Sequence, residues 1–203
     1  MLKKLMGEFR DKISDWTGFA ATRVPISRAA GSREVTLDLP GYGQIDTYCC
    51  GVVAGIMALK HFQPRASFER FYQRVQPDFE TGTSTTRLIR ALRQSGVRVT
   101  ERHDLTFADL CGAIDSGCPV IVVVQNPGED AAHWVVVYGY GKRPNRVFLA
   151  TNGLPLFTSN RVPLRRFAQL WSPHGNGLIC AERKRKSIAC PGSRGRSSAI
   201  RDA

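Results

Sequence analysis

The 203-residue sequence contains no apolar run close to the eighteen or so residues that a membrane-spanning helix requires. Residues 1–18 interrupt their apolar positions with charges every few positions, so we expect neither a signal peptide nor a membrane helix there. The six cysteines lack the paired CxxC spacing of a zinc site and the density of a secreted disulfide scaffold. These absences predict a cytoplasmic protein with reduced thiols, although an effector secreted into another cell would have the same sequence.

Acidic residues are scarce. The chain has 17 of them against 29 Lys and Arg, a formal charge of +12. Such a surplus attracts nucleic acid or acidic membrane at long range. Residues 181–203 hold seven basic and two acidic residues, so a net +5 of the surplus lies at the end of the chain. Aromatic residues are not interleaved with the basic ones, and we therefore expect no specific nucleic-acid contact. A nucleic-acid-associated role through these last residues is kept as an alternative.

The sequence also contains no internal repeat, no GxGxxG and no Walker loop, so no metal or organic cofactor is implied. An apolar fraction of 42% and a charged fraction of 23% are those of an ordinary globular protein. We predict three parts. Residues 1–36 form an amphipathic helix and a linker, residues 37–180 form one folded domain, and residues 181–203 form a basic disordered tail. Membrane contact is expected only through the first helix or the tail.

Hydrophobic periodicity predicts a helical first half followed by consecutive antiparallel strands, the order typical of an α+β fold with two lobes. Apolar residues recur at helical spacing in the earlier segments, whereas β-branched runs bounded by Gly, Pro and Asn dominate the later ones. We expect helices at 50–62, 67–75, 83–96, 107–117 and 163–171, and strands at 119–126, 133–141 and 146–153.

Cys50 is the candidate nucleophile. A cysteine attacks as its thiolate, and the N-terminus of a helix lowers the thiol pKa. Cys50 opens the predicted helix 50–62, and Gly51 after it permits close approach of a substrate or backbone. Cys49 competes for this role, but two adjacent residues at a helix start do not both face one cleft. One of the two is therefore expected to be a bystander.

His133 is the candidate general base among four histidines. His61 lies three turns along the same helix as Cys50, too far away to share a proton. His103 and His174 fall in a polar loop and a Pro/Gly-rich turn, where surface positions are expected. His133 begins a predicted strand, whose end can present the imidazole to a cleft while the following valines are buried.

Asn152 is the candidate residue that orients the imidazole. It lies near the end of the predicted strand 146–153, directly before Gly153. In an antiparallel pair, the end of this strand lies beside the start of the previous one, where His133 is expected. The geometry of the three candidates is therefore self-consistent.

Five short motifs resemble, in order, those of the double-glycine-leader, or bacteriocin-processing, peptidases among the papain-like cysteine peptidases. They are the Gln44 to Gly51 segment, a Gly-Thr helix start at Gly82, the strand from Gly117 to Val122, His133 to Val136, and Asn152. The resemblance spans residues 39–171 and implies the papain-like α+β fold. It also implies Cys50 as nucleophile, His133 as base and then acid, Asn152 as orienter and Gln44 as an oxyanion-hole donor.

The leading functional hypothesis is a cysteine peptidase acting on a peptide or protein substrate through an acyl-enzyme. An acyl-enzyme does not dictate its acceptor, so an amidase or acyltransferase is the nearest alternative. A catalytically silent peptide-binding module with the same fold is a second alternative. The sequence makes no prediction of the oligomeric state.

Overall fold

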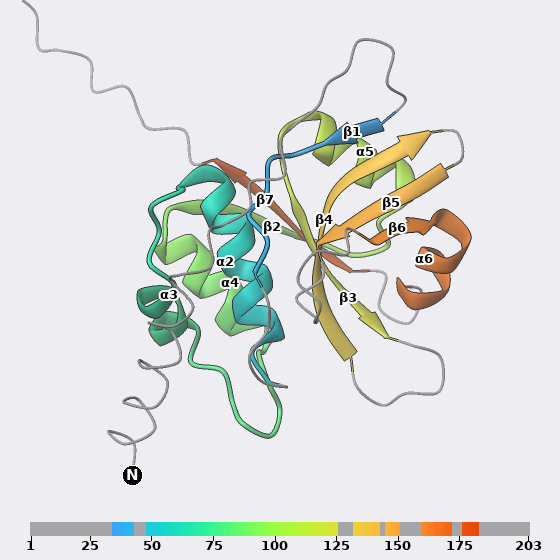
Figure 1. Ribbon diagram of the computed structural model, residues 1–203. Coiled ribbons are helices and arrows are strands. Elements are labelled where there is room, and N and C mark those ends of the chain that lie inside the picture. The colour runs from blue at the N-terminus through green and yellow to red at the C-terminus, as the bar shows by residue number, and fades with distance from the viewer. Residues whose placement is uncertain are drawn as a thin grey trace, which may run out of the picture.

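The computed structural model describes residues 34–42, 48–125, 132–142, 145–150, 160–171 and 176–182. These residues form three layers, in which a central antiparallel sheet separates two groups of helices (Figure 1). Six of the seven described strands follow the order β2-β7-β3-β4-β5-β6. The seventh, β1, lies outside this order and pairs with β4. The papain-like α+β arrangement predicted from the sequence is the one observed.

Three helices cover one face of the sheet. They are α2 (Cys50–Phe62), α3 (Phe68–Val75) and α4 (Thr85–Gln94). Their bounds agree closely with the prediction, and the side chains of Ser67 and Ser84 cap the second and third helices. Every residue of α2 from Cys50 to Leu59 is buried, as its small and apolar composition predicts. This helix is the centre of the first lobe.

The strands β3 (Val120–Gln125), β4 (Ala132–Lys142) and β5 (Asn145–Ala150) form the centre of the sheet, paired antiparallel in that order. Alternate residues of these strands face opposite sides. Ile121, Val136, Tyr138 and Phe148 join the core under α2 to α4, while their neighbours join the core on the other face. All three strands were predicted from the sequence.

The other face of the sheet is covered by α5 (Phe107–Asp115) and α6 (Leu164–Trp171). A capping box starts α5, in which Thr106 and Asp109 satisfy each other's backbone N–H. The fully buried Phe167 of α6 packs in this second core. None of the described helices is long and apolar enough to cross a membrane.

Four strands lie outside the prediction: β1 (Glu34–Thr36), β2 (Val97–Arg102), β6 (Asn160–Pro163) and β7 (Gly177–Glu182). Strands β1 and β6 are short, β2 is rich in charged residues, and β1, β2 and β7 pair with segments distant in the sequence. Strand β1 lies within the segment predicted as a linker, and β7 extends two residues into the predicted tail. The predicted first helix and residues 183–203 lie outside the described residues.

Candidate active site

Cys50 is the first residue of α2, and Cys49 is its N-cap. The Cys49 carbonyl accepts the first helical hydrogen bond from the Val53 N–H at 3.0 Å. The Cys49 side chain makes no capping hydrogen bond, and the first turn contains no acidic residue. Among the described residues, neither a Cys49 side-chain cap nor an acidic residue of the first turn offsets the positive end of the helix dipole, which favours a nearby anion. A thiolate or an oxyanion at Cys50 is the kind of anion that this position stabilises.

The two adjacent cysteines differ in their surroundings. Cys49 is 2% exposed and belongs to the apolar core under α2, whereas Cys50 is 7% exposed and lies outside that set. The core position of Cys49 supports the interpretation that it is the bystander. The small exposed fraction of Cys50 means that a substrate carbonyl has to enter a confined space to reach it.

Gly51, directly after Cys50, lies against Thr83. A Cβ atom on Gly51 would lie only 2.6 Å from the Thr83 Cβ and 2.7 Å from its Cγ2. This separation is far below van der Waals contact, so only glycine fits here without movement of the neighbouring chain. The first turn of α2 is thus held tightly against the loop that precedes α4.

His133 is the second residue of β4 and lies opposite Val124 of β3. It is half-buried, and its neighbour Trp134 packs against the core under α2. The Trp134 Nε1–H donates a hydrogen bond to the Thr83 carbonyl oxygen at 3.1 Å. Successive side chains of a regular strand point to opposite faces. Because Trp134 takes the face towards α2, regular alternation by itself does not direct the His133 side chain to that face.

The two remaining predicted site residues, Gln44 and Asn152, lie outside the described residues, so their positions stay predictions. The pairing next to Asn152 is described. Strand β5 ends at Ala150, which lies opposite Val136 of β4. Ala150 also packs against the core under α2. The end of β5 therefore lies beside the first half of β4, as the antiparallel arrangement predicted.

The other histidines have different surroundings. The ring nitrogens of His61 lie 2.7 Å from the Asp38 carbonyl oxygen and 3.2 Å from that of Gly117. The exposed His103 ring lies 2.9 Å from the Asn176 side-chain oxygen. These contacts fit structural roles for both rings. His174 lies outside the described residues.

Three other cysteines are poor nucleophiles. Burial raises the pKa of the Cys111 and Cys118 thiols above the ordinary value. Complete burial raises the pKa of the Cys180 thiol to about 12. At neutral pH these groups are almost entirely protonated, and a protonated thiol is a weak nucleophile. They provide internal references against which the reactivity of Cys50 can be measured.

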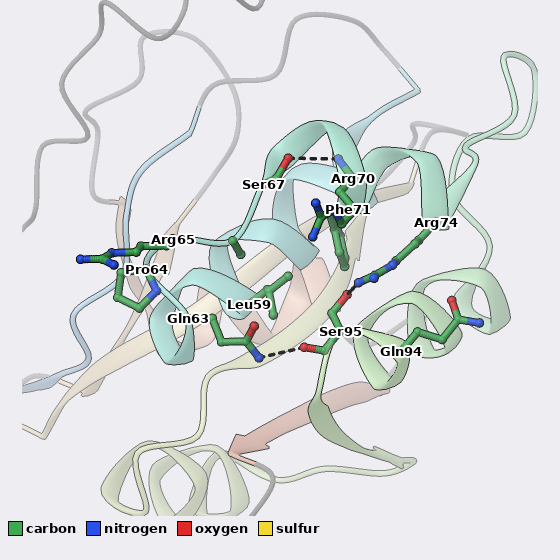
Figure 2. A pocket seen from close by; sticks show the side chains of 11 residues that line it. Leu59, Gln63, Pro64, Arg65, Ser67, Arg70, Phe71, Arg74, Gln94 and Ser95 are labelled. Atoms are coloured by element: carbon green, nitrogen blue, oxygen red, sulfur yellow. Dashed lines mark hydrogen bonds between the residues drawn. The ribbon is translucent and has the colours of Figure 1, made fainter.

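A surface pocket of about 830 Å³ lies at the opposite end of α2 (Figure 2). Leu59 and Gln63 line it, together with side chains of α3 and the end of α4. Leu59 is nine residues from Cys50, about 13 Å along a helix axis. The pocket contains none of the predicted site residues, so its size does not make it the active site. In the described part of the chain, no group of His, Cys, Asp and Glu could hold a metal ion.

Comparison with known proteins assigns the chain to a family. The profile described as the Peptidase_C39-like family matches residues 36–177. The chain belongs to the Peptidase_C39-like family. A search of curated proteins found no match.

Solved structures of C39 peptidase domains share the fold of this Peptidase_C39-like chain. The peptidase domain of Streptococcus ComA, a bifunctional ABC transporter of a quorum-sensing pathway, is 24% identical with a TM-score of 0.57, covering 72% of this chain and 98% of that domain. A double-glycine-motif protease of an AMS/PCAT transporter, solved with its leader peptide, is 16% identical with a TM-score of 0.55, covering 78% and 97%. The family resemblance and fold predicted from the sequence are thereby confirmed.

The candidate site of the Peptidase_C39-like chain includes two residues that the sequence reasoning missed, Thr83 and Trp134. Thr83 was assigned only to a helix start, and Trp134 only to a strand. The available signal was Gly82, which adopts a left-handed φ of +73° directly before Thr83. A glycine in this conformation indicates a tight turn that has to place the next residue accurately.

Proposed function

We propose that this protein is a cysteine peptidase in which the Cys50 thiolate attacks the carbonyl carbon of a peptide bond. The observation that carries the proposal is the position of Cys50 at the first turn of a buried helix that packs beside β4, the strand whose second residue is His133. Membership of the Peptidase_C39-like family supports the same reaction class.

The proposed reaction has two steps. In the first, His133 takes the proton of the Cys50 thiol, the sulfur bonds to the carbonyl carbon, and His133 gives the proton to the leaving amine as the C–N bond breaks. In the second, His133 takes a proton from water and the hydroxide bonds to the thioester carbonyl carbon. The C–S bond then breaks, the carboxylic acid product leaves, and His133 returns the proton to the Cys50 sulfur. Asn152 orients the imidazole, and the Gln44 amide with the Cys50 N–H binds the oxyanion.

The proposed substrate is a peptide or a peptide segment of a protein. One structural relative was solved in complex with a leader peptide, which supports a peptide in this role. The confined surroundings of Cys50 favour an extended chain with small residues at the cleaved bond over a folded surface. No cofactor takes part in the proposed steps.

The test is the rate of alkylation of each cysteine by iodoacetamide at pH 7 in the full chain, mapped by mass spectrometry. We expect Cys50 to react at least ten times faster than Cys111, because only Cys50 lies at a helix N-terminus with a candidate base. His133→Ala should remove most of that difference. The matched control is His103→Ala, which removes an exposed imidazole that contacts Asn176 and should leave the alkylation rate of Cys50 unchanged.

Cys49→Ala separates the two adjacent thiols and should leave the fast reaction intact. A peptide library then tests turnover: wild type should release cleaved peptides, and His133→Ala should lower kcat about 10² to 10⁴-fold. Equal alkylation of all accessible cysteines, unchanged by His133→Ala, would refute the peptidase proposal. Fast alkylation without any cleavage product would favour the silent peptide-binding module.

A further inference from the structure

The loop of residues 78–84, here called the brace loop, connects α3 to α4 and is closed by its own hydrogen bonds. Asp78 and Gly82 exchange two backbone hydrogen bonds of 2.8 and 2.9 Å. The Asp78 carboxylate accepts three more, from the Glu80 and Thr81 N–H groups and the Thr81 hydroxyl. These donors lower the pKa of Asp78, the Thr81 N–H first, so the carboxylate that holds the loop stays ionised at neutral pH.

Thr83, in the brace loop, touches both halves of the candidate site. Its side chain fills the space at Gly51, one residue after Cys50, and its carbonyl accepts the Trp134 indole hydrogen bond, one residue after His133. In Figure 1 the loop between α3 and α4 passes beneath the first turn of α2, on the side where β3 ends and β4 begins. One residue therefore contacts the segment of the nucleophile and the segment of the base.

The Thr83 side chain acts through its shape. The residue is only 6% exposed, and its hydroxyl oxygen has no hydrogen-bond partner among the described residues. A buried hydroxyl without a partner opposes folding rather than supporting it. The branched side chain, not the hydroxyl, is therefore what fits against Gly51.

We infer that Thr83 is a positioning residue that sets the separation between the Cys50 thiol and the His133 imidazole. This inference rests on the peptidase function proposed above. The brace loop fixes Thr83, its side chain fixes the first turn of α2, and its carbonyl fixes the start of β4 through Trp134. Displacement of a reacting group by about 1 Å lowers rates by up to about a hundredfold, so a small loss of fit at Thr83 should be measurable.

The experiment compares the alkylation rate of Cys50 between pH 5 and 9 in wild type, Thr83→Ala, Thr83→Val and Trp134→Phe. Thr83→Ala should lower the alkylation rate of Cys50 at pH 6–7 by about 10 to 100-fold. The pH at which this rate increases should move to a higher value. Thr83→Val keeps the branched shape and should stay within about threefold of wild type. Trp134→Phe keeps a ring but removes the indole donor, and should lower the rate about tenfold.

Ser84→Ala is the matched control, because it alters the neighbouring residue and removes the cap of α4. It should lower the melting temperature and leave the pH profile of Cys50 unchanged. A rate loss in Ser84→Ala equal to that in Thr83→Ala would reduce the effect to general destabilisation and overturn the inference. A rate in Thr83→Val as low as in Thr83→Ala would overturn the role of shape.

The two proposals fail differently. If wild-type Cys50 reacts no faster than Cys111, the peptidase proposal fails and the role of Thr83 fails with it. If wild-type Cys50 reacts fast and Thr83→Ala reacts equally fast with its fold intact, only the inference about Thr83 fails.

Discussion

Replacement of Gly51 by alanine tests the contact that positions the first turn of α2. The new methyl group would lie 2.6 Å from the Thr83 Cβ and 3.0 Å from its hydroxyl oxygen, so either the helix start or the brace loop has to move. Overpacking of this kind costs about 1–3 kcal/mol. Better helix propensity of alanine returns less than about 1 kcal/mol at a helix end. We expect Gly51→Ala to lower the free energy of unfolding by about 1–2 kcal/mol, measured by urea titration.

Gly112→Ala is the control for this substitution. Gly112 lies inside α5 and is exposed, and no atom lies within 4 Å of the position that its Cβ would occupy. Here only propensity changes, so alanine should raise the free energy of unfolding by about 0.5–1 kcal/mol. The same chemical change should therefore have opposite signs at Gly51 and Gly112.

A second substitution identifies the clashing atom. Thr83→Ala removes the Cγ2 atom at 2.7 Å and the hydroxyl oxygen at 3.0 Å but keeps the Cβ at 2.6 Å, so it relieves part of the clash, whereas Thr83→Gly removes all of it. In a double-mutant cycle, Gly51→Ala and Thr83→Gly should show a favourable coupling of about 1–2 kcal/mol, and Gly51→Ala and Thr83→Ala should show a smaller coupling of the same sign. If Gly51→Ala proves as stable as Gly112→Ala, the tight contact does not exist and the positioning argument loses its basis.

Four further predictions rest on the described residues. The raised pKa of the Cys111 and Cys118 thiols predicts that their alkylation is slow at pH 7 and accelerates as the pH is raised towards and beyond the ordinary thiol range, as mass spectrometry at several pH values would show. Cys180, with its pKa near 12, should remain unmodified until the protein unfolds, so its labelling in urea should follow the unfolding curve and not precede it. Thr106→Ala breaks the capping box of α5 and should cost about 1 kcal/mol in urea unfolding without changing Cys50 reactivity. Phe167→Ala removes a fully buried ring and should cost about 3–5 kcal/mol, and a loss below 1 kcal/mol would contradict the packing of α6.

The elements with a strong local signal were predictable from the sequence. The helix Cys50–Phe62 has the bounds that its apolar run indicated, and apolar residues at helical spacing marked the next two helices. The valine runs marked β3 and β4. In each case the residues that form the element also carry the pattern that predicts it.

The missed strands depend on distant partners. Val99 of β2 pairs with Cys180 of β7, some eighty residues later, and the alternation of Val97 and Val99 with polar residues is too short to mark a strand by itself. Dependence on distant residues also explains why the sequence did not predict Thr83 as part of the site. Its importance depends on Gly51 and Trp134, which adjoin it only after the chain has folded.

The sequence predicts which residues could carry the chemistry of the candidate site, but not which residues pack beside them. A thiol at a helix start and a histidine at a strand start can be recognised from residue type and periodicity. The face of β4 that Trp134 occupies and its hydrogen bond to the Thr83 carbonyl depend on pleat and packing that no local pattern reports.

The strand β7 holds two parts of the sheet together. Strand β7 lies between β2 and β3, pairs with both, and joins the strand next to the helical lobe to the strands beside His133. Without this pairing, the facing edges of β2 and β3 would have unsatisfied backbone groups. Loss of this pairing would leave β2 held by its packing against α4, while α2 would keep its direct packing on β3 and β4. Strand β7 therefore holds the outer strand of the sheet in place, and the helix of Cys50 rests on the sheet without its help.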